Sequence, residues 1–191
     1  MTGAEAAKRI LGEAGISDVR VEVTQGFLSD HYDPRAKVLR LSPEVHGGHS
    51  IASVGIAAHE VGHAIQHAHG YAPLSLRSAM VPMAGFGSWL AMPLIFIGFI
   101  IGSLGFIKLG IVLFSAIVFF QIVTLPVEFN ASTRAKACLA NSGIVVTEDE
   151  ARGVRKVLNA AAMTYVAAAI AAVMQLLYFL IRSGILGGGD D

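Results

Sequence analysis

Three long stretches without any Asp, Glu, Lys or Arg constrain the fold of this chain more than any other feature. They are residues 78–107, 109–127 and 157–181. A helix needs about 20 apolar residues to cross a bilayer, and each stretch has about that length or more. All 14 basic and 14 acidic residues therefore lie in the remaining segments. The sequence predicts an α-helical integral membrane protein with three transmembrane helices and a small water-exposed α+β portion, and it excludes an all-soluble fold.

The water-exposed portion is predicted to begin with a helix and a small sheet. Thr2 and Glu5 have the spacing of a capping box at a helix start. Apolar and polar residues alternate over 19–24 and again over 37–42, the pattern of half-buried strands. With the turn signal at 33–34, residues 27–42 predict a hairpin, and we expect a small antiparallel sheet. Its strand 37–42 could pair with an extended peptide, and an ordinary sheet edge is an equal alternative.

Further along the chain, capping and proline signals predict the helix boundaries. Ser50 can cap a helix that runs from about residue 51 to 69. The second charge-free stretch should end near Pro126, with a separate helix following it. Thr147 and Glu150 form another capping box, so one helix should run from about 148 to 181, from water into lipid.

The basic residues are distributed unevenly about the charge-free stretches. Residues 1–77 and 128–156 carry twelve of the 14 Lys and Arg residues, whereas Lys108 and Arg182 are alone on the other side. Cytoplasmic segments of membrane proteins carry the excess of basic residues. We therefore expect the water-exposed portion to face the cytoplasm from the inner (cytoplasmic) membrane.

Net charge and cysteine content exclude other classes of protein. The formal net charge is +0, so no basic surplus points to a nucleic-acid partner. Cys138 is the one cysteine, which excludes a scaffold held by intrachain disulfides. The partners expected are the lipid bilayer and a polypeptide, and the oligomeric state is not predicted.

The predicted helix 51–69 contains the motif His59-Glu60-Val61-Gly62-His63. Histidines four residues apart lie on one helical face, where both imidazoles can bind one zinc ion. The glutamate beside the first histidine is then placed to take a proton from the zinc-bound water. This arrangement is typical of a zinc hydrolase with Glu60 as general base.

A third protein ligand for zinc must come from elsewhere, and three residues are candidates. His69 follows His63 at the metzincin spacing, but Gln66 stands where that motif needs a glycine to turn the chain. His67 lies about 12 Å along the helix axis from His59, which is too far for both to bind one ion. Glu128 is the strongest candidate, since it is the one acidic residue between Glu60 and Glu148 and lies at a predicted membrane boundary.

Another residue could contribute to the same site. Arg134 follows Glu128 by less than two helical turns and could contact an oxyanion or the substrate, although an anchoring role at the end of a span is the stronger expectation.

Several segments together resemble the YugP-like bacterial membrane zinc metallopeptidases. They are Leu41-Ser42-Pro43-Glu44-Val45, Ser50-Ile51-Ala52, the run from Ala57 to Gln66 around the motif, and Leu125-Pro126-Val127-Glu128-Phe129-Asn130-Ala131-Ser132. The resemblance implies a membrane-embedded gluzincin, distantly similar to HtpX-type proteases, with His59, His63 and Glu128 on zinc and Glu60 as base.

The chain departs from the family pattern at two places. Members usually begin with one more hydrophobic segment, which is absent here. In HtpX-type enzymes an Asp follows the glutamate ligand by four residues, and here that position is Ser132. A hydroxyl at this position can still orient a ligand histidine, less strongly than a carboxylate.

The function predicted from the sequence is a zinc-dependent endopeptidase at the cytoplasmic membrane surface. A non-catalytic membrane scaffold stabilised by zinc is the alternative, and a transporter is disfavoured because the spans lack ionisable residues. The expected organisation is a cytoplasmic α+β portion at 1–77 with the zinc-binding helix at 51–69, a transmembrane hairpin at 78–127, cytoplasmic helices at 128–156 with the third ligand, a third span at 157–182 and a flexible tail at 183–191.

Overall fold

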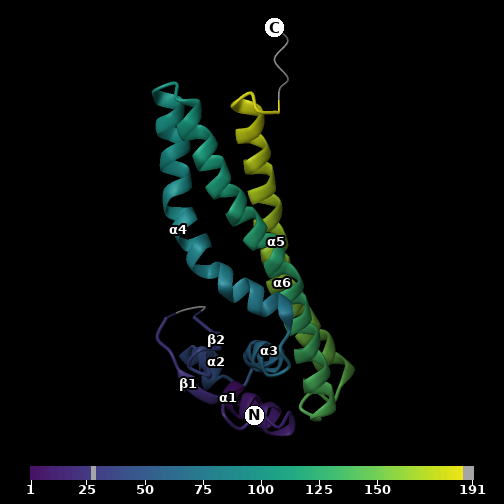
Figure 1. Cartoon of the computed structure of the whole chain (residues 1–191). Helices are drawn as coiled ribbons and strands as arrows, with labels where there is room; N and C mark the ends of the chain where they lie inside the picture. The colour runs from purple at the N-terminus through teal and green to yellow at the C-terminus, as the bar shows by residue number, and fades with distance from the viewer. Residues whose placement is uncertain (27–28, 187–191) are drawn as a thin grey trace. The chain divides into compact units, whose positions relative to one another are not determined.

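The computed structural model describes residues 1–26 and 29–186, so residues 187–191 of the predicted tail lie outside the described part. The chain divides into two compact units, 1–75 with 126–163 and 76–125 with 164–191. The elements in chain order are α1 Gly3–Glu13, β1 Arg20–Val23, β2 His31–Asp33, β3 Val38–Leu41, α2 Pro43–His46, α3 Ile51–Ala68, α4 Ala72–Ile100, α5 Leu104–Asn141 and α6 Glu148–Arg182 (Figure 1).

The sheet of the first unit is mixed, in the order β1-β3-β2. β2 and β3 pair antiparallel, which confirms the hairpin. β1 pairs parallel with β3, so the prediction of a purely antiparallel sheet is wrong. Alternation of apolar residues predicts a strand and its buried face, but it carries no information about strand direction. Because both edges of β3 are already paired, strand 37–42 is central, so neither of its two expected roles, pairing with a peptide substrate or forming an ordinary sheet edge, is correct.

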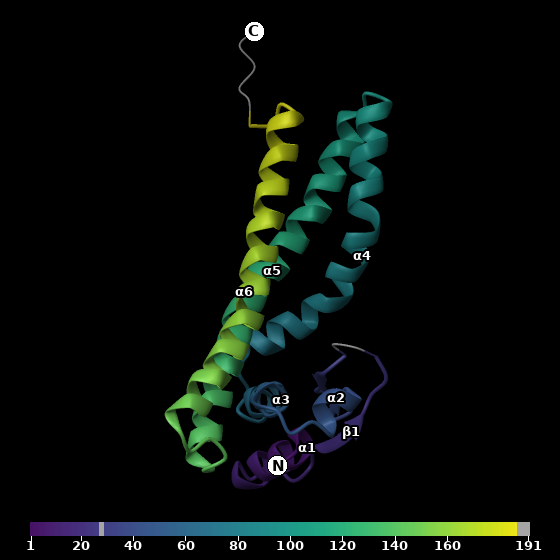
Figure 2. The ribbon, with the colours of Figure 1, turned by 180° about the vertical axis from the view of Figure 1, so that it is seen from behind.

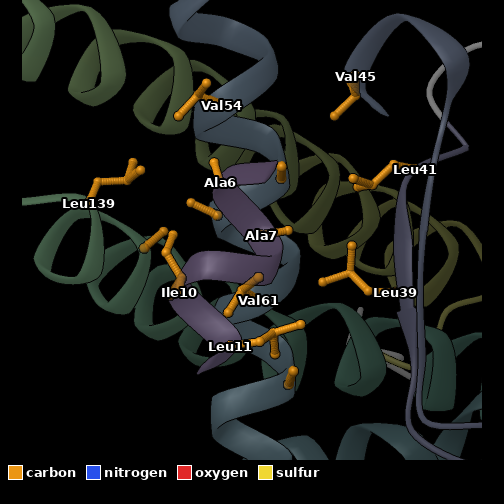
Figure 3. Close-up of a cluster of buried hydrophobic side chains, with 14 of the residues drawn as sticks. Ala6, Ala7, Ile10, Leu11, Leu39, Leu41, Val45, Val54, Val61 and Leu139 are labelled. Atoms are coloured by element: carbon orange, nitrogen blue, oxygen red, sulfur yellow. The ribbon is translucent and has the colours of Figure 1, made fainter. Parts of the chain in front are cut away.

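Helix α1 packs against α3 and forms the core of the first unit with it. Its inward face carries Ala6, Ala7, Ile10 and Leu11, each at most 3% exposed. Figure 3 shows these side chains directed at the neighbouring elements, where they meet Val54 and Val61 of α3, Leu39 and Leu41 of β3 and Leu139 of α5. Burial of a large aliphatic side chain contributes about 1.5–3 kcal/mol, so this cluster fixes the position of α3.

The helix starts follow the predicted caps. The Thr2 and Glu5 capping box is present. Ser50 accepts from the backbone N–H of Ser53 at the start of α3. The Thr147 and Glu150 capping box opens α6.

Helix α5 continues without a break through Pro126, so the prediction of a separate helix after Pro126 is wrong. Proline removes one N–H donor, and long helices with packed neighbours tolerate that loss. The turn between α4 and α5 lies at residues 101–103, where Gly102 has a φ of 66°. Lys108 lies inside α5, because a single charged residue near a helix end does not break the helix.

Three helices of the described chain are long and apolar enough to cross a membrane, namely α4, α5 and α6. In the second unit, α4 and α5 lie side by side, as Figures 1 and 2 both show. Ile95, Ile107, Ile111 and Phe179 form the core there, whereas large side chains such as Trp89 are exposed, as lipid-facing residues are. The prediction of a helical membrane protein with a small α+β portion is confirmed.

Candidate metal centre

The two motif histidines lie on one face of α3. Their ring centroids are 4.8 Å apart and the rings meet edge to face at 85°. The side chain of His59 is 13% exposed and that of His63 is 9% exposed. Four residues make slightly more than one helical turn, which is why the two imidazoles project together.

Glu128 reaches the same point from α5 and is 2% exposed. Its Oε2 lies 3.1 Å from His59 Nε2 and 3.6 Å from His63 Nε2. Ligand atoms of the three residues all lie within 4.8 Å of one another, and among the described residues this is the one such group of His, Cys, Asp and Glu. At bond lengths of 2.0–2.2 Å, tetrahedral zinc places its ligand atoms about 3.3 Å apart. Two imidazoles and a carboxylate at this spacing therefore fit a zinc ion.

A glycine inside the motif permits this approach of α3 to α5. An added Cβ at Gly62 would lie 2.5 Å from the carbonyl oxygen of Ala131. Real contacts between carbon and oxygen are about 3.3 Å or longer, so no larger residue fits without movement. Gly62 could not be identified from the sequence, because the need for a glycine comes from the crossing of two distant segments.

Each histidine has a hydrogen-bond partner on the ring nitrogen that faces away from Glu128. His59 Nδ1 lies 3.2 Å from the hydroxyl of Ser132 on α5. His63 Nδ1 lies 3.0 Å from Oε1 of Gln66 on α3. Partners of this kind hold a ligand imidazole in orientation. The sequence predicts such a role for Ser132, whereas nothing in it singles out Gln66 for this contact.

The buried carboxylates govern the protonation of His63. Burial by itself disfavours the imidazolium form, but contact with Glu128, the charge of Glu60 and the Gln66 hydrogen bond outweigh it and raise the pKa of His63 above its usual value of 6.5. The negative charge of the two carboxylates therefore favours the binding of a cation at this centre.

Glu60 follows His59 on α3 and is 8% exposed. Its negative charge is one of the causes of the raised pKa of His63. In a zinc hydrolase a carboxylate at this position can exchange protons with a reacting water.

The two alternative ligands contact other residues instead. His67 Nδ1 lies 2.8 Å from the hydroxyl of Tyr32. His69 is the residue that caps the C-terminus of α3, and its Nδ1 is 3.3 Å from Arg134 Nη1. Arg134 also donates from Nε to Asn130 Oδ1 at 2.8 Å. Neither His67 nor His69 joins the group formed by the motif histidines within the described residues.

Known proteins are similar to this chain over nearly its full length. Residues 1–184 match the family described as "Putative neutral zinc metallopeptidase". The chain is 52% identical over 191 residues to "Putative membrane protease YugP" of Bacillus subtilis (strain 168), an alignment that covers 100% of this chain and 83% of the relative. Comparison with solved structures finds none that matches. Both matches include the motif helix and Glu128.

Proposed function

Because the chain belongs to the family described as "Putative neutral zinc metallopeptidase", we propose that it is a membrane-embedded zinc endopeptidase of the gluzincin type. His59, His63 and Glu128 hold the metal in this proposal, and Glu60 is the general base. The observation that carries it is the convergence of two imidazoles and a buried carboxylate from α3 and α5 within 4.8 Å, with Glu60 next to His59 in the sequence. The family description indicates that the metal is zinc, and the two imidazoles and the carboxylate of this group fit a zinc ion.

The residues of the chain have separate tasks in peptide hydrolysis. A bound zinc ion supplies Lewis-acid polarisation of the scissile carbonyl and lowers the pKa of water toward 7. Glu60 takes the proton from the attacking water and passes it to the leaving amine. Ser132 and Gln66 hold the two imidazoles. Arg134 is a candidate for contact with the substrate carbonyl or oxyanion, although it also bonds Asn130.

The substrate of this proposal is a polypeptide close to the membrane, because α5, which carries Glu128, continues into an apolar segment. α5 has 38 residues and α6 has 35, which give lengths of about 57 Å and 52 Å. Both exceed the about 30 Å thickness of a hydrocarbon core, so part of each helix extends into water. The twelve-to-two split of basic residues supports a cytoplasmic location for that part, with residues 1–77 and 128–156 on the cytoplasmic side of the inner membrane.

Replacement of Glu60 by glutamine tests the proposal, since it removes the base and keeps the ligands. Glu60→Gln should retain one zinc per chain and lose casein or peptide cleavage, measured on purified protein in detergent. Glu44→Gln is the matched control, because Glu44 is exposed on α2 and lies outside the centre. Undiminished turnover in Glu60→Gln would refute the mechanism. Bound zinc without any cleavage by the wild type would favour a zinc-stabilised scaffold.

A further inference from the structure

Gln66 is fully buried and uses both ends of its amide. The residue is 0% exposed. Nε2 donates to the backbone carbonyl of Val127 at 2.8 Å and to Asn130 Oδ1 at 3.0 Å. Oε1 lies 3.0 Å from His63 Nδ1. A buried amide with all these contacts links the motif helix to the helix that carries Glu128.

The partners of Gln66 determine which way its amide points. A backbone carbonyl accepts hydrogen bonds and never donates them, so the group facing Val127 must be the NH2. The other partner, Asn130 Oδ1, also accepts from Arg134 Nε, which is always a donor. Both contacts place the amide oxygen of Gln66 against His63. Each of these hydrogen bonds therefore has a fixed donor: Arg134 and Gln66 both donate to Asn130 Oδ1, and His63 donates to Gln66 Oε1.

This direction fixes the proton on His63. Since Oε1 of Gln66 can only accept, Nδ1 of the neutral imidazole carries the hydrogen and Nε2 carries the lone pair. The distance from His63 Nε2 to Glu128 Oε2 is 3.6 Å, which is longer than an ordinary hydrogen bond, so the tautomer is assigned from the Gln66 contact. A metal ligand needs its lone pair at this position.

We propose that Gln66 is a positioning residue that holds His63 in its Nδ1–H tautomer and so presents Nε2 to the metal. This inference rests on the proposed function, because it assigns Gln66 a task in the zinc site. Ser132 serves His59 differently. Its hydroxyl can donate or accept, so it orients that ring without choosing the tautomer.

Two substitutions separate this task from a merely structural one. Gln66→Met removes both the acceptor for His63 and the donors to α5. Gln66→Glu keeps an acceptor for His63 Nδ1–H but places it against the oxygens of Val127 and Asn130, so it should lower the melting temperature. A purely structural Gln66 predicts that the variants lose stability and that neither changes the tautomer of His63.

The tautomer can be read in the metal-free protein, independently of activity. In ¹⁵N-histidine-labelled protein at alkaline pH, the ring signals of His63, assigned with His63→Gln, should show the Nδ1–H form alone. Gln66→Met should give a mixture of tautomers and Gln66→Glu should restore the Nδ1–H form. An Nε2–H tautomer at His63 in the wild type would overturn the proposal, even if no variant folds.

Zinc affinity supplies the second readout. Gln66→Met should weaken zinc binding about 10- to 100-fold, the usual effect of losing a residue that orients a ligand. Gln66→Glu and the exposed control Gln25→Met should stay close to the wild type. Equal zinc affinity in wild type and Gln66→Met would refute the role of Gln66 and leave the proposed function standing. A wild type that binds no zinc at these histidines would refute the proposed function instead, and the tautomer result would still be readable.

Discussion

Replacing Gly62 by alanine adds one methyl group where α3 crosses α5, and its effect on the metal centre follows from the distances there. The new Cβ would lie 2.5 Å from the carbonyl oxygen of Ala131. An ordinary contact needs about 3.3 Å, so the two helices must separate by about 0.8 Å at this point. Glu128 lies three residues before Ala131 on the same helix, so it moves with the carbonyl.

A displacement of this size is large for a metal site, where metal–ligand distances hold within about 0.2 Å. Overpacking of a core costs about 1–3 kcal/mol. If zinc binding requires the closer approach, that strain weakens zinc affinity by about 5- to 150-fold, since about 1.4 kcal/mol is a factor of ten. Gly62→Ala should therefore fold and bind zinc poorly.

Gly55→Ala is the matched control on the same helix. An added Cβ at Gly55 meets no atom within 4 Å. Alanine is favoured over glycine in a helix interior by about 1 kcal/mol, so this variant should be slightly more stable and should bind zinc like the wild type. Calorimetric zinc titration with thermal unfolding of both variants measures the difference. Equal zinc affinity in Gly62→Ala and Gly55→Ala would refute the idea that the close helix crossing sets the metal geometry.

Two further predictions concern the third ligand and the membrane topology. Glu128→Ala should lower zinc affinity strongly, because two histidines and solvent remain, whereas His69→Ala should leave it almost unchanged; metal titration of both variants checks this, and the opposite ranking would favour a metzincin-like site. In a Cys138→Ala background, a cysteine at Lys108 should react with an impermeant thiol reagent applied to intact cells and one at Lys136 should not, and the reverse labelling pattern would invert the proposed topology.

Local sequence patterns were sufficient to predict that His59 and His63 share one helical face and to select Glu128 as the candidate third ligand. The four-residue spacing of His59 and His63 on a capped helix puts both rings on one side, whatever surrounds them. Glu128 could be identified because an isolated acidic residue at a membrane boundary is costly without a function. The structure brings these three side chains together.

The contacts that hold the centre together could not be predicted in the same way. Gly62 and Gln66 act through a helix more than 60 residues away, and no local pattern reports which residues meet there. From the sequence, the one inference about Gln66 is that a residue other than glycine at this position argues against a metzincin turn. In the structure, its side chain forms buried hydrogen bonds with His63 and with the backbone of Val127. The continuation of α5 through Pro126 is a further case in which the local rule for proline was not decisive.

Zinc K-edge X-ray absorption of the purified protein, loaded with one equivalent of zinc, tests the assignment of the metal centre most directly. We expect four light-atom neighbours at about 2.0–2.2 Å, with the outer-shell scattering of two imidazole rings. Glu128→Ala should retain the imidazole signature and lose part of the oxygen contribution, or lose the metal. A spectrum without imidazole scattering, or one that His59→Ala and His63→Ala leave unchanged, would contradict the assignment of the metal to this centre.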